Sequence, residues 1–145
     1  MAQYQATVNS PLSIDDAFDY LADFSSVREW DPSVTKAEAL GPKPPALGSR
    51  FHVVTRFMGS DTELDYEIVE IERPRLVVLR AETPALVSLD RISFRPIGTG
   101  SRVVYDADLR LKGARRAFEL PLRVAFRRLG DNARDGLAEA LSSRD

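Results

Sequence analysis

Apolar residues along this chain recur at two different spacings, and the spacing predicts the order of the secondary-structure elements. Residues 4–8 are short and extended, and the turn-forming residues Asn9-Ser10-Pro11 end that strand. From Ser13 onward the spacing becomes helical. Ser13 is a good N-cap, and aspartates follow in the first turn, where the helix dipole favours negative charge. We therefore expect a strand and then a helix, whose apolar residues are Ile14, Ala17, Phe18, Leu21 and Ala22.

The only tryptophan of the chain, Trp30, lies where this helical pattern ends. A second, shorter helical piece is expected over residues 24–29. Asp31-Pro32 follows Trp30 at once, and a proline disfavours the α conformation for the residue before it. The Asp-Pro pair is therefore predicted to stop the helix. Residues 34–40 then have the pattern of a strand, and the glycine- and proline-rich residues 41–45 that of a stiff surface loop.

From residue 48 to residue 111, strand-like runs rich in β-branched and aromatic residues are separated by short turns. The breaks lie at residues 58–61, 73–74, 83–85 and 98–100. Strands joined so closely must be antiparallel, because parallel neighbours need crossover connections of about a dozen residues or more. These five strands are therefore predicted to form one curved antiparallel sheet.

Helical spacing returns in the last segment, from about residue 116 to residue 141. Its apolar residues share one arc, so the helix should pack on the sheet. Pro121 either lies in the first turn or kinks the helix. Gly136 falls within the apolar arc, where glycine costs about 1 kcal/mol relative to alanine, and this indicates that something there needs room. The arc consists of Phe118, Leu122, Ala125, Phe126, Leu129, Ala133, Leu137 and Ala140.

Alternation along the strands sorts side chains into an inner and an outer face. Asp90 falls on the inner face together with Ile92, and a carboxylate there needs a partner or water. A structural interpretation pairs it with an arginine such as Arg80. The apolar run at residues 76–79 leaves its own facing open. The other residues expected on the inner face are Phe51, Val53, Thr55, Phe57, Leu64, Tyr66, Ile68, Phe94, Val103, Tyr105, Ala107, Leu109 and Leu111.

Composition excludes several classes of protein and site. The length of 145 residues fits a single domain spanning 1–145, and a net charge of −2 argues against non-specific nucleic-acid binding. Without cysteine there can be no disulfide or thiolate metal site. We see no targeting signal or membrane-spanning run, so a cytoplasmic location without membrane insertion is expected.

The chain has few residues that could bind a metal ion or act in nucleophilic catalysis. The only histidine, His52, is predicted on the outer face of the sheet, so no histidine cluster can bind a metal and no histidine base is available to a serine. The glycines at residues 98–100 lie in a hairpin with no helix after them, so they indicate a turn and not a phosphate site. We therefore expect neither a metal nor a cofactor.

The order of elements and several segments together resemble the START-like or SRPBCC superfamily, and most of all its polyketide cyclase/dehydrase and lipid-transport group. The resemblance implies an α+β helix-grip fold, in which a curved antiparallel sheet of about seven strands wraps a long C-terminal helix and two short helices follow the first strand. The segments that carry it are SPLSIDDAFDYLADFSSVREWDPSV, LGSRFHV, LDYEIVEIERPRLVVLR, DRISFRP, GTGSRVVYDADLRLKG and GDNARDGLAEAL.

The resemblance also implies an apolar cavity between sheet and helix that opens toward the short helices. Trp30 would be a wall or lid residue at its rim, or else it only fills one end of the core. Asp90, Tyr66 and Tyr105 are the polar candidates for acid-base chemistry. The candidate ligand-binding residues are Trp30, Phe51, Val53, Phe57, Tyr66, Asp90, Ile92, Tyr105, Phe118, Leu122 and Phe126.

Three functions remain open at this point. The first is binding of a hydrophobic small molecule such as a lipid, a polyketide or a quinone-like compound, and we favour it. The second is a polyketide cyclase or dehydratase that uses the pocket Asp and Tyr groups. The third is a partner-modulating quinone-binding protein, with Arg123, Arg127 and Arg128 as its contact points. Whether the chain forms a homodimer stays open.

Overall fold

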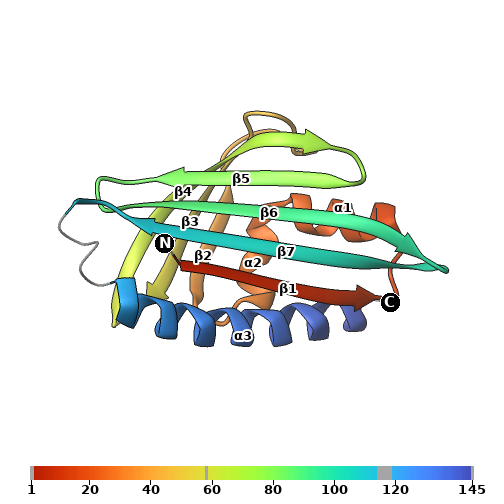
Figure 1. The fold of residues 1–145 in the computed structure, drawn as a ribbon. Coiled ribbons are helices and arrows are strands. Elements are labelled where there is room, and N and C mark those ends of the chain that lie inside the picture. The colour runs from red at the N-terminus through yellow and green to blue at the C-terminus, as the bar shows by residue number, and fades with distance from the viewer. Residues whose placement is uncertain (1, 58, 114–118, 145) are drawn as a thin grey trace.

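A curved antiparallel sheet encloses one long helix in this protein (Figure 1). The computed structural model describes residues 2–57, 59–113 and 119–144. None of the helices in those ranges is long and apolar enough to cross a membrane. In chain order the elements are β1 (Ala2–Ser10), α1 (Ile14–Ala22), a 3-10 turn η1 (Phe24–Ser26), α2 (Val27–Trp30), β2 (Val34–Ala39), β3 (Arg50–Phe57), β4 (Ser60–Glu72), β5 (Leu76–Glu82), β6 (Leu86–Ile97), β7 (Gly100–Leu111) and α3 (Glu119–Ser143).

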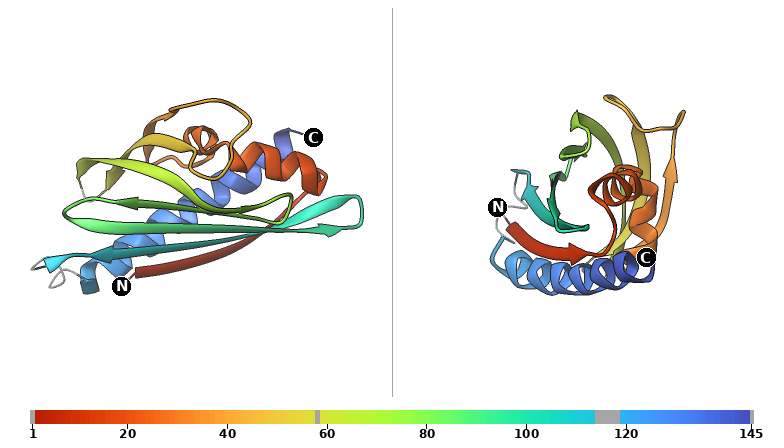
Figure 2. Two further views of the ribbon diagram at one scale, coloured as in Figure 1. Left: turned by 90° about the horizontal axis from the view of Figure 1, so that it is seen from above. Right: turned by 90° about the vertical axis from the view of Figure 1, so that its right-hand side faces the viewer.

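The sheet has seven strands in the order β1-β7-β6-β5-β4-β3-β2, and every neighbouring pair is antiparallel. Strands β3 to β7 form the predicted meander. Strand β1 pairs with the last strand, from Ala2 opposite Leu109 to Ser10 opposite Ser101. Figure 2 shows the sheet curving around a space that α3 closes along one side, with α1 and α2 inside the curve at one end. The helix-grip architecture expected from the resemblance is confirmed.

The local signals at the first helices act as predicted. The Ser13 hydroxyl accepts a hydrogen bond from the Asp16 amide at 3.2 Å and caps α1. The second helical segment is split into η1 and α2 and ends at Trp30, one residue later than expected. Asp31 has the extended backbone (φ −101°, ψ 108°) that is favoured before a proline. The Asp-Pro pair therefore does stop the helix.

The structure extends strand β1 beyond its predicted bounds and shows which side chains of β5 face the core. Strand β1 is longer than residues 4–8, because its backbone pairs with β7 beyond the apolar centre of the strand. A register shift between Ile68 and Glu70 in β4 accompanies the pairing with β5. Within the apolar run that begins β5, Val77 and Leu79 are fully buried in the main core.

Helix α3 contacts its neighbours through two glycines. A Cβ atom on Gly136 would overlap the carbonyl oxygen of Trp30, and one on Gly130 would lie 2.5 Å from the ring of Tyr4. The predicted need for room at Gly136 is thus confirmed. Pro121 is the third residue of α3 and lies in its first turn, where proline is tolerated. Phe118, expected on the apolar arc, lies outside the described residues.

Candidate functional site

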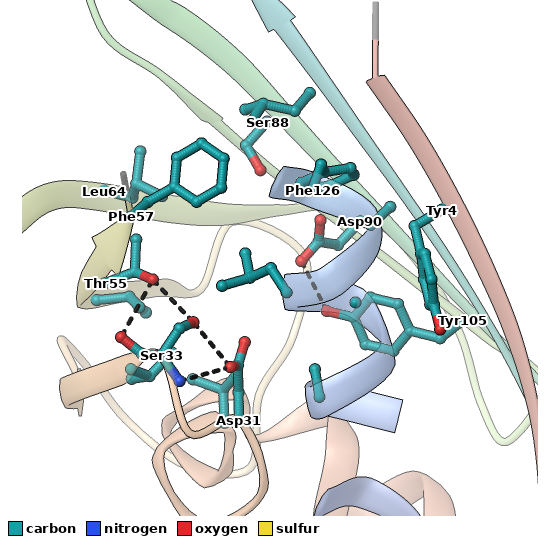
Figure 3. Close-up of a pocket in the computed structure, with 18 of the residues that line it drawn as sticks. Tyr4, Asp31, Ser33, Thr55, Phe57, Leu64, Ser88, Asp90, Tyr105 and Phe126 are labelled. Atoms are coloured by element: carbon teal, nitrogen blue, oxygen red, sulfur yellow. Dashed lines mark hydrogen bonds between the residues drawn. The ribbon is translucent and has the colours of Figure 1, made fainter. Parts of the chain in front are cut away.

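A cavity of about 140 Å³ lies between the inner face of the sheet and α3 (Figure 3). Its wall is mostly apolar, and aromatic side chains from both sheet and helices form much of it. The aromatic residues are Tyr4, Phe24, Trp30, Phe57, Tyr66, Tyr105 and Phe126. The polar and charged residues are Asp31, Ser33, Thr55, Thr62, Ser88, Asp90 and Arg134.

The structure brings most of the candidate ligand-binding residues to this wall. Those that line the cavity are Trp30, Val53, Phe57, Tyr66, Asp90, Tyr105 and Phe126. Phe51 and Ile92 face the same side of the sheet but lie in the packed core beyond the cavity. Leu122 lies in a smaller apolar cluster with Ala2 and Leu109. Phe118 falls outside the described residues.

Asp90 is the most deeply placed carboxylate of the wall, with only 7% of its surface exposed. The Tyr105 hydroxyl donates a hydrogen bond to Asp90 Oδ2 at 2.6 Å. Burial raises the pKa of Asp90 to about 7, the Tyr105 hydrogen bond opposes that rise, and the negative charge of Asp31 adds to it. Asp90 therefore titrates near neutral pH, whereas an exposed aspartate is fully ionised there.

Arg80 does not pair with Asp90, so that expectation was wrong. Residue Leu79 is the one that lies opposite Asp90 in the β5–β6 register, and Arg80, the next residue, points to the other face of the sheet. Its guanidinium donates to Glu82 at 2.9 Å on that outer face. The carboxylate of Asp90 is stabilised by a phenol instead of a cation.

Tyr66 and Tyr105, two phenols of the wall, remain protonated at neutral pH. Burial raises the pKa of Tyr105 well above its ordinary value, and the charge of Asp90 raises it further. Burial also raises the pKa of Tyr66, whose hydroxyl lies 2.8 Å from that of Ser88. Tyr105 is therefore a hydrogen-bond donor to Asp90, and Tyr66 and Ser88 share one hydrogen bond in which either hydroxyl is the donor.

A second carboxylate, Asp31, lines the cavity, and the sequence pattern did not reveal it. Its Oδ1 accepts hydrogen bonds from the Ser33 amide at 2.9 Å and the Ser33 hydroxyl at 2.8 Å. The Ser33 hydroxyl lies 3.0 Å from that of Thr55 on β3 (Figure 3). Asp31, Ser33 and Thr55 therefore form one hydrogen-bonded polar cluster in the wall. Burial raises the pKa of Asp31, and the Ser33 hydrogen bonds oppose this. The Asp-x-Ser spacing is typical of such a turn and was the available signal.

Trp30 belongs both to the core and to the cavity wall. Its side chain is 4% exposed, and its ring meets that of Tyr105 edge-on with 5.5 Å between the ring centroids. Its Nε1 is buried and has no hydrogen-bond partner among the described residues. A buried donor without an acceptor is unfavourable, because it has lost its hydrogen bond to water.

An ionic cluster borders the cavity where β1 meets α3. The Tyr4 hydroxyl donates to Asp131 at 2.5 Å, and Arg134 lies 3.6 Å from Asp131 and 3.1 Å from Asp135. Burial and the Asp131 hydrogen bond raise the pKa of Tyr4 to about 12. Arg134 therefore reaches the cavity wall with its charge already balanced by two carboxylates.

His52 takes no part in the cavity. It faces outward from β3, as predicted, and its ring contacts Asp65 at 2.7 Å and Glu63 at 3.3 Å. Within residues 2–57, 59–113 and 119–144, no three His, Asp or Glu side chains lie close enough together to bind a metal ion.

Comparisons with known proteins agree with this architecture. The model of the family described as polyketide cyclase/dehydrase and lipid transport matches residues 1–142. No curated protein sequence matches the chain.

Three solved structures have the same fold. The protein TTHA0849 from Thermus thermophilus is 16% identical with a TM-score of 0.75, and the match covers 96% of each chain. A START superfamily protein from Mycobacterium smegmatis is 15% identical with a TM-score of 0.73, covering 99% of this chain and 97% of that one. The Zhui aromatase/cyclase from a Streptomyces species is 14% identical with a TM-score of 0.77, covering 96% and 92%.

Proposed function

Since the chain belongs to the polyketide cyclase/dehydrase and lipid transport family, we propose that it binds a hydrophobic small molecule in the cavity between the sheet and α3. The observation that carries this proposal is a mainly apolar cavity lined by a few polar groups, which is the usual form of a small-molecule site. The START and aromatase/cyclase proteins of the same fold support it as analogues.

The size of the cavity limits what enters without rearrangement. Its volume of about 140 Å³ is close to that of a protein cavity that holds benzene, about 150 Å³. A ligand with one ring or a short chain fits the cavity as it stands, and a longer lipid requires side chains to move.

The proposal is tested by native mass spectrometry of the protein purified from its own host and by titration of Trp30 fluorescence. Fatty acids, quinones and aromatic polyketides are the first ligands to titrate. We expect a co-purified or saturably bound apolar molecule that shifts the emission, because the indole lines the cavity. If no ligand class binds, the cavity is an ordinary gap in the core.

A cavity-filling substitution provides a matched test. Ala107 lines the cavity from β7, and Ala107→Leu should weaken binding at least about tenfold, because the added atoms occupy ligand space. Arg110→Leu is the control, since that side chain is exposed on the other face of the same strand. Equal affinities for the two variants, measured by fluorescence titration, would show that the ligand binds outside the cavity.

Acid-base catalysis is the second candidate, and one observation favours it. Asp90 has a pKa of about 7 and lies beside the Tyr105 phenol, so at neutral pH it can take a proton from an enolisable substrate and return it. We expect Asp90→Asn to lower kcat at least about a hundredfold on such a substrate, which is the usual contribution of a positioned acid-base group. A variant that turns substrate over like the wild type would eliminate this function.

A further inference from the structure

The charges that line the cavity are mainly negative. Asp31 and Asp90 reach it from different parts of the chain, one just after α2 and the other from β6. Among the described residues of the wall, Arg134 is the only basic side chain, and it is paired with Asp131 and Asp135. The carboxylates in the wall therefore lack a cationic partner.

One oxygen of each carboxylate is available to a ligand. Asp90 Oδ2 accepts the Tyr105 hydroxyl and Asp31 Oδ1 accepts the Ser33 groups. Within the described part of the chain, Asp90 Oδ1 and Asp31 Oδ2 have no hydrogen-bond partner, and neither is sealed away from open space. Figure 3 shows Asp90 beside Tyr105 and Asp31 beside Ser33, at two different places on the wall. A ligand between them would meet acceptors that need donors.

Aromatic rings form the rest of the surroundings. Trp30 stands edge-on to Tyr105, and Phe24 stands edge-on to Tyr66 with 5.0 Å between the ring centroids. All four rings line the cavity. Aromatic faces attract cations, and the attraction is stronger where water is excluded.

We propose that the cavity binds an organic ammonium ion, in which a protonated amine is carried by an apolar body of about one ring. The ammonium donates to the free oxygen of Asp90, the negative charge of Asp31 adds to the attraction, and the apolar body contacts the aromatic wall. This inference rests on the binding function proposed above and narrows it. Above the pKa of Asp90, a fatty acid or another carboxylate is disfavoured, because its charge would lie beside two like charges without a free cation to balance them.

Binding of such a cation is coupled to the protonation of Asp90. Near neutral pH this carboxyl is partly protonated, since burial raises its pKa to about 7 and Asp31 adds to the rise. The other titratable groups at the wall are Tyr4, Tyr66, Tyr105 and Arg134, and these keep their protons near neutral pH. An ammonium ion favours ionised Asp90 and should therefore release a proton as it binds.

The test uses three ligands that share one ring: benzylamine, benzyl alcohol and benzoate. At about pH 8, above the pKa of Asp90, isothermal titration calorimetry should show benzylamine binding at least about tenfold more tightly than benzyl alcohol, with benzoate weakest. At about pH 6.5 the heat of benzylamine binding should depend on the ionisation enthalpy of the buffer, which reports the released proton.

Asp90→Asn should reduce the ratio of amine to alcohol affinity to less than about threefold and abolish the buffer dependence. Asp106→Asn is the matched control, because this carboxylate of β7 accepts from Gln5 on the outer face and should leave the ratio unchanged. Alcohol or benzoate binding as tightly as the amine overturns the charge preference alone. If none of the three binds, the proposed binding of ring-sized ligands fails with it.

Discussion

The free energy of unfolding should fall by about 4 kcal/mol as the pH rises from 3.8 to about 7, through the titration of Asp90 alone. Burial raises the pKa of this carboxyl in the folded state, so within that range the folded protein keeps a proton that the unfolded chain has released. The stabilising contribution is complete below the unfolded pKa of 3.8 and is lost as the pH passes the folded pKa of about 7. Asp31, whose pKa is raised too, acts in the same direction.

Urea denaturation at a series of pH values measures this effect, and Asp90→Asn isolates it. The amide cannot ionise, so the variant should be more stable than the wild type by about 4 kcal/mol at pH 8 and about equally stable near pH 4. Asn still offers a carbonyl oxygen to the Tyr105 hydroxyl.

Other groups titrate in both proteins and cancel in the comparison. The pKa of His52 is raised by Asp65, so its contribution also declines as the pH rises. The pKa values of Asp23 and Glu82 are lowered by their partners, so their contributions disappear in acid. Parallel pH profiles for the wild type and Asp90→Asn would show that Asp90 is not buried in a protonated form.

Gly136→Ala should destabilise the protein by about 2 kcal/mol or more, although alanine has the better helix propensity. The new Cβ overlaps the carbonyl oxygen of Trp30, which is a backbone atom, so α2 must shift relative to α3. Overpacking of this kind costs up to about 3 kcal/mol or more, which exceeds the gain of about 1 kcal/mol from helix propensity. Thermal unfolding measures the change in stability. A shift in Trp30 emission would accompany it, because α2 must move.

Gly130→Ala is the matched substitution, since its Cβ meets the ring of Tyr4 instead of a backbone atom. Combining it with Tyr4→Ala should remove the clash and make the glycine replacement neutral or favourable in that background. No side-chain truncation at Trp30 can relieve Gly136→Ala in the same way, because the clash is with the carbonyl. A Gly136→Ala variant as stable as the wild type would contradict the close contact between α2 and α3.

The order of the elements could be predicted because its signals are local. The Ser13 cap, the Asp31-Pro32 stop and the short turns between strands depend only on neighbouring residues. The ends of β1 depend on its pairing with β7, which is distant in sequence and extends beyond the apolar pattern. The facing of residues 76–79 likewise depends on the irregular pairing between β4 and β5. Such long-range pairing leaves no mark in a single segment.

For the candidate site, strand alternation predicted which side chains face the inside of the sheet. Parity placed Asp90 on the inner face, and the same parity, applied across the β5–β6 register, places Arg80 on the outer one. Alternation separates inner from outer faces, but it does not say where along α3 an inner side chain lies. Ile92 in the packed core therefore could not be distinguished from Tyr105 at the cavity. Asp31 was missed because its direction is set by a turn with Ser33 and not by strand period.

The two glycine contacts of α3 bear on the thermodynamics of ligand binding. Apolar cavities tend to shrink, because closing them restores packing between the walls. Here α3 already touches the Trp30 carbonyl of α2 at Gly136 and the Tyr4 ring of β1 at Gly130, so it cannot move closer to either without a clash. The space is thus preorganised. A ligand that fits it need not separate helix from sheet, and more of its contact energy is available as affinity.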